Sequence, residues 1–548
     1  EPAPDTVVVR VRTSQSRIEI ATAARARFTR DGVPEPVARA YLELGGFVAH
    51  DLTFDAAAGE TAQVEKVAAI YTSRDLAISE CAAEAARAVA DAGAFDELET
   101  SHERAWGGFW RRADIVLVAD DMDQAALRLN IFHIAQCISL YSIERDAGVP
   151  ARGLHGEAYR GHVFWDELFI FPPVTGKLPA ITRGLLMYRY HRLGAARRLA
   201  SAAGFRGALY PWQSGSSGDE ESPRLHLNPR SGRWLPDHTH LQRHVNLAIA
   251  YNVWRYYLST RDRTFLHLYG AEMMLEISRL FDSLATFNEE TGRYEIKGVM
   301  GPDEYHDAYP DREEPGLDNN AYTNVMTVWL LRQSLRMLDE VPPELRSDLV
   351  ERLALGEEEQ ARWADIAQRM TVPFHDDGII SQFEGYEKLE EFDWAGYREK
   401  YGDIHRLDRI LEAEGDTPNR YKLSKQADVC MLFYLLPLDR LIEVIEGLGY
   451  RFSEELARRN IEYYLARTSH GSTLSSVVHA SVLARIDPEG AWPHFRQALT
   501  ADQQEAGTTK EGIHLGAMAG AVDIIESSYA GIERINEHLH VRPRLPKR

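Results

Sequence analysis

Long hydrophobic runs are missing from this sequence of 548 residues, and cysteine is scarce. No apolar run approaches the roughly 20 residues that a membrane-spanning helix needs, so we expect no membrane partner. Cys81, Cys137 and Cys430 are odd in number and far apart, which is typical of a reducing compartment, and we expect the cytoplasm. The start "EPAPDTVVV" also lacks the apolar core of a signal peptide, although it is consistent with a trimmed chain.

Basic charge is in deficit, with 62 Lys and Arg against 83 Asp and Glu, for a net charge of −21. Binding to nucleic acid requires clustered Lys and Arg, so we expect no nucleic-acid partner. The acidic residues are scattered along the chain, which is typical of a charge that keeps a protein in solution.

The motifs of several enzyme classes are also missing. No glycine-rich phosphate loop or dinucleotide fingerprint follows a strand, and no nucleophile elbow of the G-x-S-x-G type occurs. The segment "HTHLQRH" (238–244) has three histidines but lacks the partners of a zinc site, so we expect them to be solvated or bonded within loops. The sequence therefore predicts neither a cofactor nor a metal.

Three kinds of sequence follow one another along the chain. Short β-branched runs with period-two features occur between residues 6 and 72, and three of them, "TVVVRVRT", "RIEIATAARARF" and "QVEKVAAIYTS", are typical of strands. An Ala- and Glu-rich helical pattern follows from residue 73. From about residue 125 onward, amphipathic helices alternate with polar loops rich in Gly and Pro, without a short repeat; examples of the predicted helices are 242–260, 321–338 and 425–448. Apolar residues make up 44% of the chain, enough for a large core, so we predict a mainly α-helical domain behind a small β region.

The loops of the helical region carry carboxylates, amides and aromatic side chains. The segment "GVMGPDEYHDAYPDREEPGLDNNAYTN" (298–324) sets an Asp-Glu pair in a turn beside Tyr305 and His306. Flat aromatic rings stack on sugar rings, polar side chains bind hydroxyl groups, and two carboxyl groups suffice to cleave a glycosidic bond. A pair such as Asp303 and Glu304 can also merely cap a helix, but its setting favours a sugar site.

Six segments in order carry a specific resemblance. They are "GHVFWDELFIFP" (161–172), "GVMGPDEYH" (298–306), "DNNAYTN" (318–324), "KQADVCMLFYL" (425–435), "SHGSTLSSVVHA" (469–480) and "TTKEGIHLGAMAG" (508–520). Together they resemble glycoside hydrolase family 65, which contains maltose, trehalose and kojibiose phosphorylases and related α-glucosidases.

The resemblance implies a fold and its boundaries. It implies the C-terminal part of an N-terminal β-sandwich (1–72), a helical linker (73–124), an (α/α)6 barrel catalytic domain (125–530) and the start of a truncated C-terminal β-sheet domain (531–548). In this family the N-terminal sandwich contributes to dimerisation and to one wall of the site. We therefore expect a homodimer, and we expect full activity to need the missing flanking segments.

The resemblance also assigns roles to single residues. It implies that Glu304 is the general acid, which must hold a proton near neutral pH, and burial among aromatic side chains would provide this by raising its pKa. The residues expected to bind the substrate are Trp165, Asp166, Lys425 and Gln426 for the glucosyl unit, and Trp212, Asn320 and Tyr322 beside the leaving group, although Trp165 could instead be a core residue.

The nucleophile distinguishes two readings of the resemblance. A hydrolase needs a second carboxylate to activate water, and Glu511 in "GTTKEGIH" (507–514) stands where the phosphorylases have no Glu, because its charge would repel phosphate. The loop with His470, Ser472 and Thr473, and His514 beyond it, resembles instead the phosphate-binding residues of the phosphorylases. We favour an inverting α-glucosidase with an α-1,2 preference over a disaccharide phosphorylase that uses phosphate as co-substrate. A non-catalytic sugar-binding scaffold is a third hypothesis.

Overall fold

The structure is a computed structural model that describes residues 2–153, 156, 158–376, 378–503, 512–535 and 538–546. The chain divides into two compact units, Glu1–Asp114 and Ile115–Arg548. The first unit is rich in β-strands and the second is mainly helical, which confirms the predicted fold class. In the described parts of the chain, no helix is both long enough and apolar enough to cross a membrane.

The first unit is built around an antiparallel sheet. Its elements are β1 (Thr6–Arg12), β2 (Glu19–Arg30), β3 (Val33–Pro34), β4 (Ala38–Leu44), β5 (Phe47–Thr53), β6 (Ala62–Thr72), α1 (Cys81–Asp91) and α2 (Phe95–Ala113). Strand β2 lies between β1 and β6, and β4 pairs with β5 in a separate hairpin. The three runs predicted as strands are β1, β2 and β6.

Helix α1 packs on this sheet, because both surfaces carry small buried side chains. Ala21 and Ala23 of β2 contact Cys81, Ala85 and Val89 of α1. Arg25, also on β2, is buried and donates hydrogen bonds to the last carbonyl groups of α1 (2.6 Å to Val89 O and 2.9 Å to Ala92 O). The first helix of the predicted linker is therefore part of the β unit.

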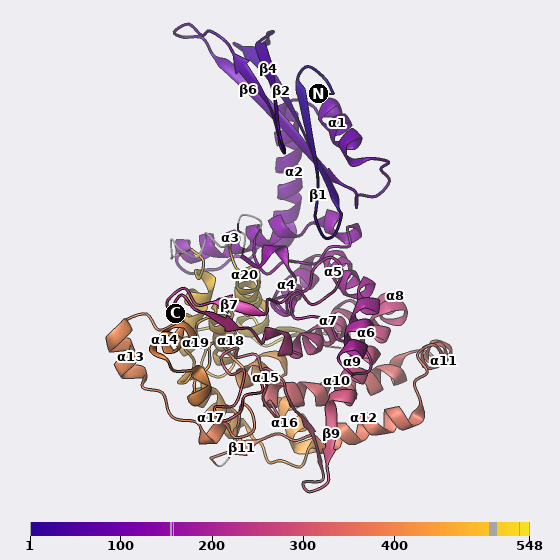
Figure 1. The fold of residues 1–548 in the computed structure, drawn as a ribbon, viewed down its shortest axis with the longest axis vertical. Helices are drawn as coiled ribbons and strands as arrows, with labels where there is room; N and C mark the ends of the chain where they lie inside the picture. Colours follow the sequence, from indigo (N-terminus) through magenta and orange to yellow (C-terminus); the bar gives the residue numbers. More distant parts are fainter. Residues whose placement is uncertain are drawn as a thin grey trace. The chain divides into compact units, whose positions relative to one another are not determined.

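Six helices form a closed ring in the described part of the second unit (Figure 1). They are α4 (Glu167–Lys177), α7 (His244–Thr260), α10 (Ala321–Glu340), α15 (Val429–Leu435), α18 (Thr473–Ala484) and α20 (Leu515–Asp523). Each contacts the next in this order, and α20 contacts α4. Most of their side chains are buried on all sides, as expected for the inner layer of an (α/α)6 barrel.

An outer layer of helices covers the ring. It consists of α3 (Asp121–Cys137), α5 (Pro179–His191), α9 (Ala271–Leu284), α12 (Glu357–Arg369), α16 (Leu438–Gly447), α17 (Glu454–Leu465) and α19 (Pro488–Leu499). The remaining helices are α6 (Leu193–Ala202), α8 (Arg263–Phe265), α11 (Pro343–Arg352), α13 (Trp394–Tyr401) and α14 (Leu407–Glu414).

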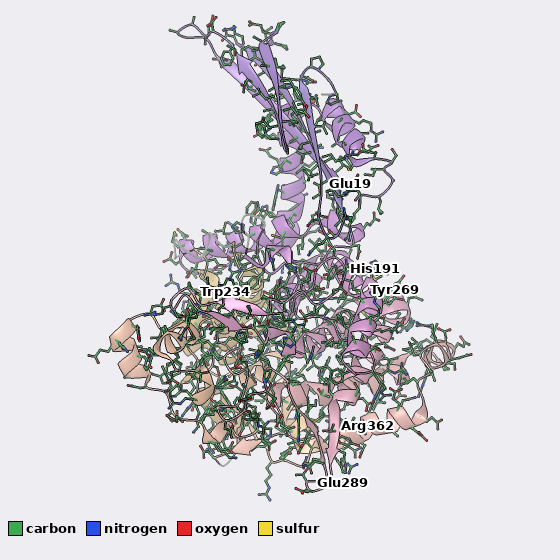
Figure 2. All side chains as sticks on the ribbon, in the orientation of Figure 1. Glu19, His191, Trp234, Tyr269, Glu289 and Arg362 are labelled. Atoms are coloured by element: carbon green, nitrogen blue, oxygen red, sulfur yellow. The ribbon has the colours of Figure 1, made fainter. Side chains whose placement is uncertain are left out.

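Short strands occur in the connections of the second unit. They are β7 (Leu225–Leu227), β8 (Trp234–Pro236), β9 (Ala285–Asn288), β10 (Arg293–Ile296), β11 (Phe374–His375), β12 (Ile379–Ile380), β13 (Ile532–Ile535) and β14 (His538–Val541). The β7–β8 hairpin lies in the connection before α7 and exposes Trp234 (Figure 2).

One predicted helical segment is divided in the structure. The pattern over 425–448 indicated a single amphipathic helix, but α15 ends at Leu435 and α16 begins at Leu438. Pro437 lies between them, and proline can neither donate the helical hydrogen bond nor leave the preceding residue helical. The segments predicted around α7 and α10 are confirmed as single helices.

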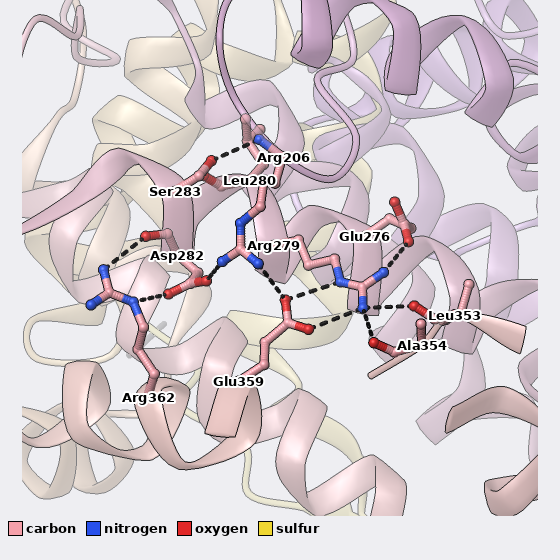
Figure 3. Close-up of polar contacts among 10 residues, drawn as sticks. All are labelled: Arg206, Glu276, Arg279, Leu280, Asp282, Ser283, Leu353, Ala354, Glu359 and Arg362. Atoms are coloured by element: carbon pink, nitrogen blue, oxygen red, sulfur yellow. Dashed lines mark hydrogen bonds and ion pairs between the residues drawn. The ribbon is translucent and has the colours of Figure 1, made fainter. Parts of the chain in front are cut away.

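Ion pairs fasten α12 to α9 on the outside of the ring (Figure 3). Arg279 donates two hydrogen bonds of 3.0 Å to the Glu359 carboxylate and one of 2.8 Å to the carbonyl of Leu353. Asp282 is fully buried and accepts hydrogen bonds from Arg206 and Arg362. Because Arg279 and Glu359 are largely enclosed and paired through two bonds, this contact is of the kind that stabilises a fold.

We expect Arg279→Ala to destabilise the second unit by about 2–3 kcal/mol, because it leaves the enclosed Glu359 carboxylate without its two-bond partner. Arg346→Ala removes an exposed pair with Asp339 and should cost about 0.5 kcal/mol or less. Urea unfolding followed by tryptophan fluorescence measures both. Equal urea midpoints for the two variants would show that the Arg279 contacts contribute no more to the free energy of unfolding than the exposed Arg346 pair does.

Candidate active site

The N-terminal ends of three inner helices, α4, α7 and α10, contact one another. The ring of Trp165, just before α4, lies 4.8 Å from the ring of His244 at the start of α7. His244 in turn lies 6.0 Å from Tyr322, in the first turn of α10. Asn320, which caps α10, donates a 3.2 Å hydrogen bond to Asp428 at the start of α15.

The N-terminal ends of α15, α18 and α20 complete this circuit. The backbone N–H of Gly471, before α18, donates to the carbonyl of Lys425 before α15 (2.9 Å). Thr473 of α18 hydrogen-bonds His514 of α20 (2.5 Å), and His514 Nε2 lies 2.7 Å from Asp166 at the start of α4. All six inner helices therefore begin at the same end of the ring, where their dipoles give a positive potential.

Glu304 lies at this end, in the loop that precedes α10. Its carboxylate lies 2.5 Å from Lys425 Nζ and 3.3 Å from Gln426 Nε2. Its backbone φ of 63° is in the left-handed region, which few residues other than glycine adopt. Such conformations persist only where the surroundings fix them, and they cluster at functional sites. The structure thus brings together three predicted site residues from two loops.

The immediate partners of Glu304 differ from those we expected. We predicted aromatic side chains around the carboxyl group, whereas an ammonium group and an amide contact it. Burial by itself favours the neutral amine of Lys425, but the Glu304 carboxylate outweighs this effect and raises the pKa of Lys425. Glu304 is therefore held by a charged pair at a site that is largely closed to solvent.

A buried polar group lies next to Glu304 and fixes its loop. Asp303 Oδ2 lies 2.7 Å from His306 Nδ1, and both side chains are fully buried. The backbone N–H of Asp303 points to Asp428 Oδ2 (3.4 Å), and Gln426 donates to the carbonyl of Pro302 (2.7 Å). Burial, and then the charge of Asp303, raise the pKa of Asp428 well above its ordinary value, which favours its protonated form.

Two tryptophans line the α4 and α7 side of the site. The rings of Trp165 and Trp212 lie 6.1 Å apart, and that of Trp212 lies 5.2 Å from His244. Both tryptophans are more than nine-tenths buried in this structure. His244 is buried as well, and burial lowers its pKa to about 3, so the ring is neutral. Asp166 lies next to Trp165, where His514 fixes its carboxylate.

The predicted nucleophile residues gather at α18 and α20. Ser472 and His514 occupy the N-cap positions of the two helices, and neither side chain caps the helix that follows. The first N–H groups of a helix have no partner within it, so such ends attract anions. His470 has a left-handed backbone and hydrogen-bonds Ser475 (2.9 Å). Burial, and then nearby basic groups, lower the pKa of His470 to about 4, so it is neutral at physiological pH.

Three predicted residues have other surroundings. Glu511 lies outside the described residues. Asn320 is fully buried and uses its side chain within the protein, donating to the carbonyl of Gln382 (3.1 Å) and accepting from Thr323 (2.9 Å). Tyr322 is fully buried too. Asn320 therefore forms its hydrogen bonds within the protein, and the ring of Tyr322 lies 6.0 Å from that of His244.

Sequence reasoning missed the polar residues beneath the site. Asp428 stands three residues after Lys425 in a quoted motif, but nothing in the sequence shows that it meets the loop of Glu304. The pair of Asp303 and His306 could have been predicted from the sequence, because residues three apart in a tight turn can face each other. In the described ranges, the side chains close enough to hold a metal together are Glu19, Glu80 and Cys81 of the first unit, and Glu80 there caps α1.

Comparisons with known proteins cover the whole chain. The central catalytic domain of glycosyl hydrolase family 65 matches residues 128–523, and the N-terminal domain of the same family matches residues 1–109. An uncharacterised glycosyl hydrolase of Mycobacterium tuberculosis is 51% identical over 553 residues, which span 100% of this chain and 41% of that protein.

Relatives with a named activity are more distant. A trehalose 6-phosphate phosphorylase of Lactococcus lactis is 39% identical over 82% of this chain and 58% of its own length. A kojibiose phosphorylase of Thermoanaerobacter brockii is 32% identical over 97% and 67%. A solved structure titled as a candidate kojibiose phosphorylase from the human microbiome has the same fold, with a TM-score of 0.78 at 22% identity, over 98% of this chain and 66% of that one. The chain thus spans about two fifths to two thirds of these proteins.

The buried pair of Asp303 and His306 predicts a pH-dependent stability. Burial lowers the pKa of His306, but the charge and hydrogen bond of Asp303 outweigh this, so the folded pKa is raised above 6.5. The pair therefore contributes fully below about pH 6.5, and this contribution is lost as the pH rises through the folded value.

We expect the stability difference between the wild type and His306→Gln to be largest near pH 6 and to narrow toward about pH 9. Urea midpoints across this range measure it. The exposed His102→Gln variant serves as a control and should change stability little at any pH. A difference that widens with rising pH would contradict the charged pair.

Proposed function

The chain belongs to glycoside hydrolase family 65, and we propose that it transfers the glucosyl unit of an α-linked glucoside to inorganic phosphate, with inversion at the anomeric carbon. In this reaction the bond from C1 to the leaving-group oxygen breaks, and Glu304 supplies the proton that this oxygen needs. A phosphate oxygen forms the new bond to C1 from the opposite face, which yields β-glucose 1-phosphate.

The proposal rests mainly on one observation, which is the contact between the N-terminal ends of α18 and α20. Two helix ends without side-chain caps meet there through Thr473 and His514. His470 precedes α18, and its neutral imidazole can donate a hydrogen bond to an anion bound there. Backbone N–H groups at helix ends together with hydroxyl and imidazole donors are the usual means of holding phosphate.

Two described carboxylates near the N-terminal ends of α18 and α20 already bind His514. Asp166 lies 2.7 Å from His514 Nε2, and Asp502 accepts the backbone N–H of His514 (2.5 Å). A hydrolase needs a second carboxylate that is free to activate water. Because each of these carboxylates already binds His514 through one oxygen, we favour phosphate over water as the nucleophile.

Lys425 and Gln426 connect substrate binding with the acid. Both donors contact the Glu304 side chain in this structure. A glucosyl unit bound between them and Asp166 would offer its hydroxyl groups as new acceptors. Drawing the ammonium group away removes the cation that stabilises the carboxylate, so that Glu304 can carry the proton it must donate.

Hydrolysis is the second candidate, and the sequence itself favours it through Glu511. A carboxylate at that position could activate water and would repel phosphate. On this reading the enzyme is an inverting α-glucosidase that prefers an α-1,2-linked substrate. The disaccharide and its linkage are open on both readings, since the named relatives act on different glucosides.

Glu304→Gln should reduce cleavage of a natural disaccharide by about 10³-fold, because the amide keeps the shape of the side chain but has no proton to give. Initial rates on trehalose, kojibiose, nigerose and maltose measure the loss. Glu313→Gln, an exposed change in the same loop, is the matched control and should keep wild-type rates. Activity of Glu304→Gln within about tenfold of the wild type would refute the role of Glu304 as acid.

Phosphate dependence separates the two candidate functions. We expect the same four disaccharides to be cleaved only with inorganic phosphate, and proton NMR during early turnover should show β-glucose 1-phosphate. Release of glucose without phosphate, together with a loss of about 100-fold or more in Glu511→Gln, would establish hydrolysis instead. An initial α-configured product would exclude inversion on either reading.

A further inference from the structure

Basic side chains gather in the loop 224–243, which leads into α7. Arg243 occupies the N-cap position of α7 and is half-buried. Burial lowers its pKa, and its guanidinium makes no hydrogen bond or ion pair with any described residue. By contrast, Arg189 pairs with Glu167, and Arg406 pairs with Asp408. A partly desolvated guanidinium without a partner is costly unless a ligand satisfies it.

Further cations surround Arg243. Burial, and then the positive charges of Arg224 and Arg243, lower the pKa of His240, and His238 adds to the effect. Among the nearby carboxylates, Glu220 accepts hydrogen bonds from the backbone of Trp212 (2.8 Å) and from Ser222 (2.7 Å), and Asp237, within the loop, accepts one from Thr239 (2.6 Å). Because the loop 224–243 contains four arginines and one aspartate, it keeps a positive charge in a chain whose net charge is −21.

A second observation also points to a polar ligand in this loop. Gln242 is 1% exposed, and neither atom of its side-chain amide has a hydrogen-bond partner in the described structure. The Nδ1 atoms of His238 and His240 are buried and make no hydrogen bond to the described residues either. Buried polar atoms of native proteins nearly always have partners, so several such atoms in one short loop indicate a binding place for a polar group.

The loop runs beside the acid loop. The backbone N–H of Met300 donates to the carbonyl of Leu241 (3.0 Å), and His244 Nδ1 lies 3.3 Å from the carbonyl of Met300. At the other end, His238 Nδ1 lies 3.9 Å from Asp307 Oδ2. Met300 and Asp307 lie on either side of Glu304 in the sequence. The basic loop therefore runs beside the segment that supplies the proton in the proposed reaction.

The order of the inner helices places the loop on the leaving-group side. In the ring α4–α7–α10–α15–α18–α20, α7 is three positions from α18 and therefore opposite to it. The nucleophile residues belong to α18 and α20. In an inverting displacement the nucleophile and the leaving group take opposite faces of the sugar carbon. The basic loop at α7 thus lies where the departing sugar is expected.

We propose that Arg243, with Arg224, His238 and His240, binds a phosphate monoester on the leaving sugar, so that the substrate is a glucosyl hexose phosphate. This inference rests on the proposed function for the direction of attack. Arg243 would form charge-assisted hydrogen bonds to the phosphate oxygens, and the histidines and Gln242 would add donors. The phosphate on the leaving sugar is chemically unchanged, and a separate phosphate serves as the nucleophile.

Calorimetry with glucose 6-phosphate and glucose tests the site without turnover. Saturating inorganic phosphate is kept present to fill the nucleophile site. We expect the wild type to bind glucose 6-phosphate about 30-fold or more tighter than glucose, and Arg243→Gln to reduce this preference to about threefold or less. Arg224→Gln, at an exposed position, should reduce it in part. Arg440→Gln, a matched change at a distant exposed pair, should leave it intact.

Equal binding of the two sugars by the wild type, or a full preference in Arg243→Gln, would overturn the inference. Turnover then distinguishes it from the proposed function. For any disaccharide that is cleaved, kcat/KM should be higher for the form with a 6-phosphate on the leaving sugar. Cleavage without this preference would refute the anion site alone. A binding preference without cleavage of any glucoside would support the anion site and count against the proposed function.

Discussion

The closed circuit of contacts at the N-terminal ends of the inner helices is the constraint on which this site depends. The inner helices are buried on nearly all sides, so they have no polar face on which a site could form. Polar chemistry is therefore confined to the segments that precede them. Because these six ends meet through Trp165, His244, Asn320, Asp428 and His514, loops far apart in sequence are held around one space.

The same constraint sets the electrostatics of the site. Six aligned dipoles and Lys425 favour negative charge, which suits the anionic nucleophile of the proposed reaction. The buried carboxylates beneath the mouth are each compensated. Asp303 has His306, Asp166 has His514, and Asp428 is favoured in its protonated form. The helix dipoles at this end of the ring are thus opposed by few uncompensated buried carboxylates among the described residues.

The fold could be predicted in its large features, and the site only in part. Helical periodicity predicted α7 and α10, but missed the division of 425–448 because the apolar pattern continues across Pro437. The motifs named Glu304, Lys425 and Gln426, and the structure brings these together. The partnership of Asp428 with the acid loop and the isolation of Arg243 depend on packing between distant segments, which no local pattern records.

The helix order also separates two anions that the proposed reaction would handle at once. A nucleophilic phosphate at α18 and α20 and a substrate phosphate beside Arg243 would repel each other if they shared one end of the site. Helix α4 lies between them on one side of the ring, α10 and α15 lie between them on the other, and the charges of Lys425 and Glu304 lie at the same end of the ring. Coulomb repulsion falls with distance and with intervening charge of the opposite sign. A ring of six helices can therefore hold two phosphates on opposite sides of one glycosidic bond, which a site built from two adjacent helices could not.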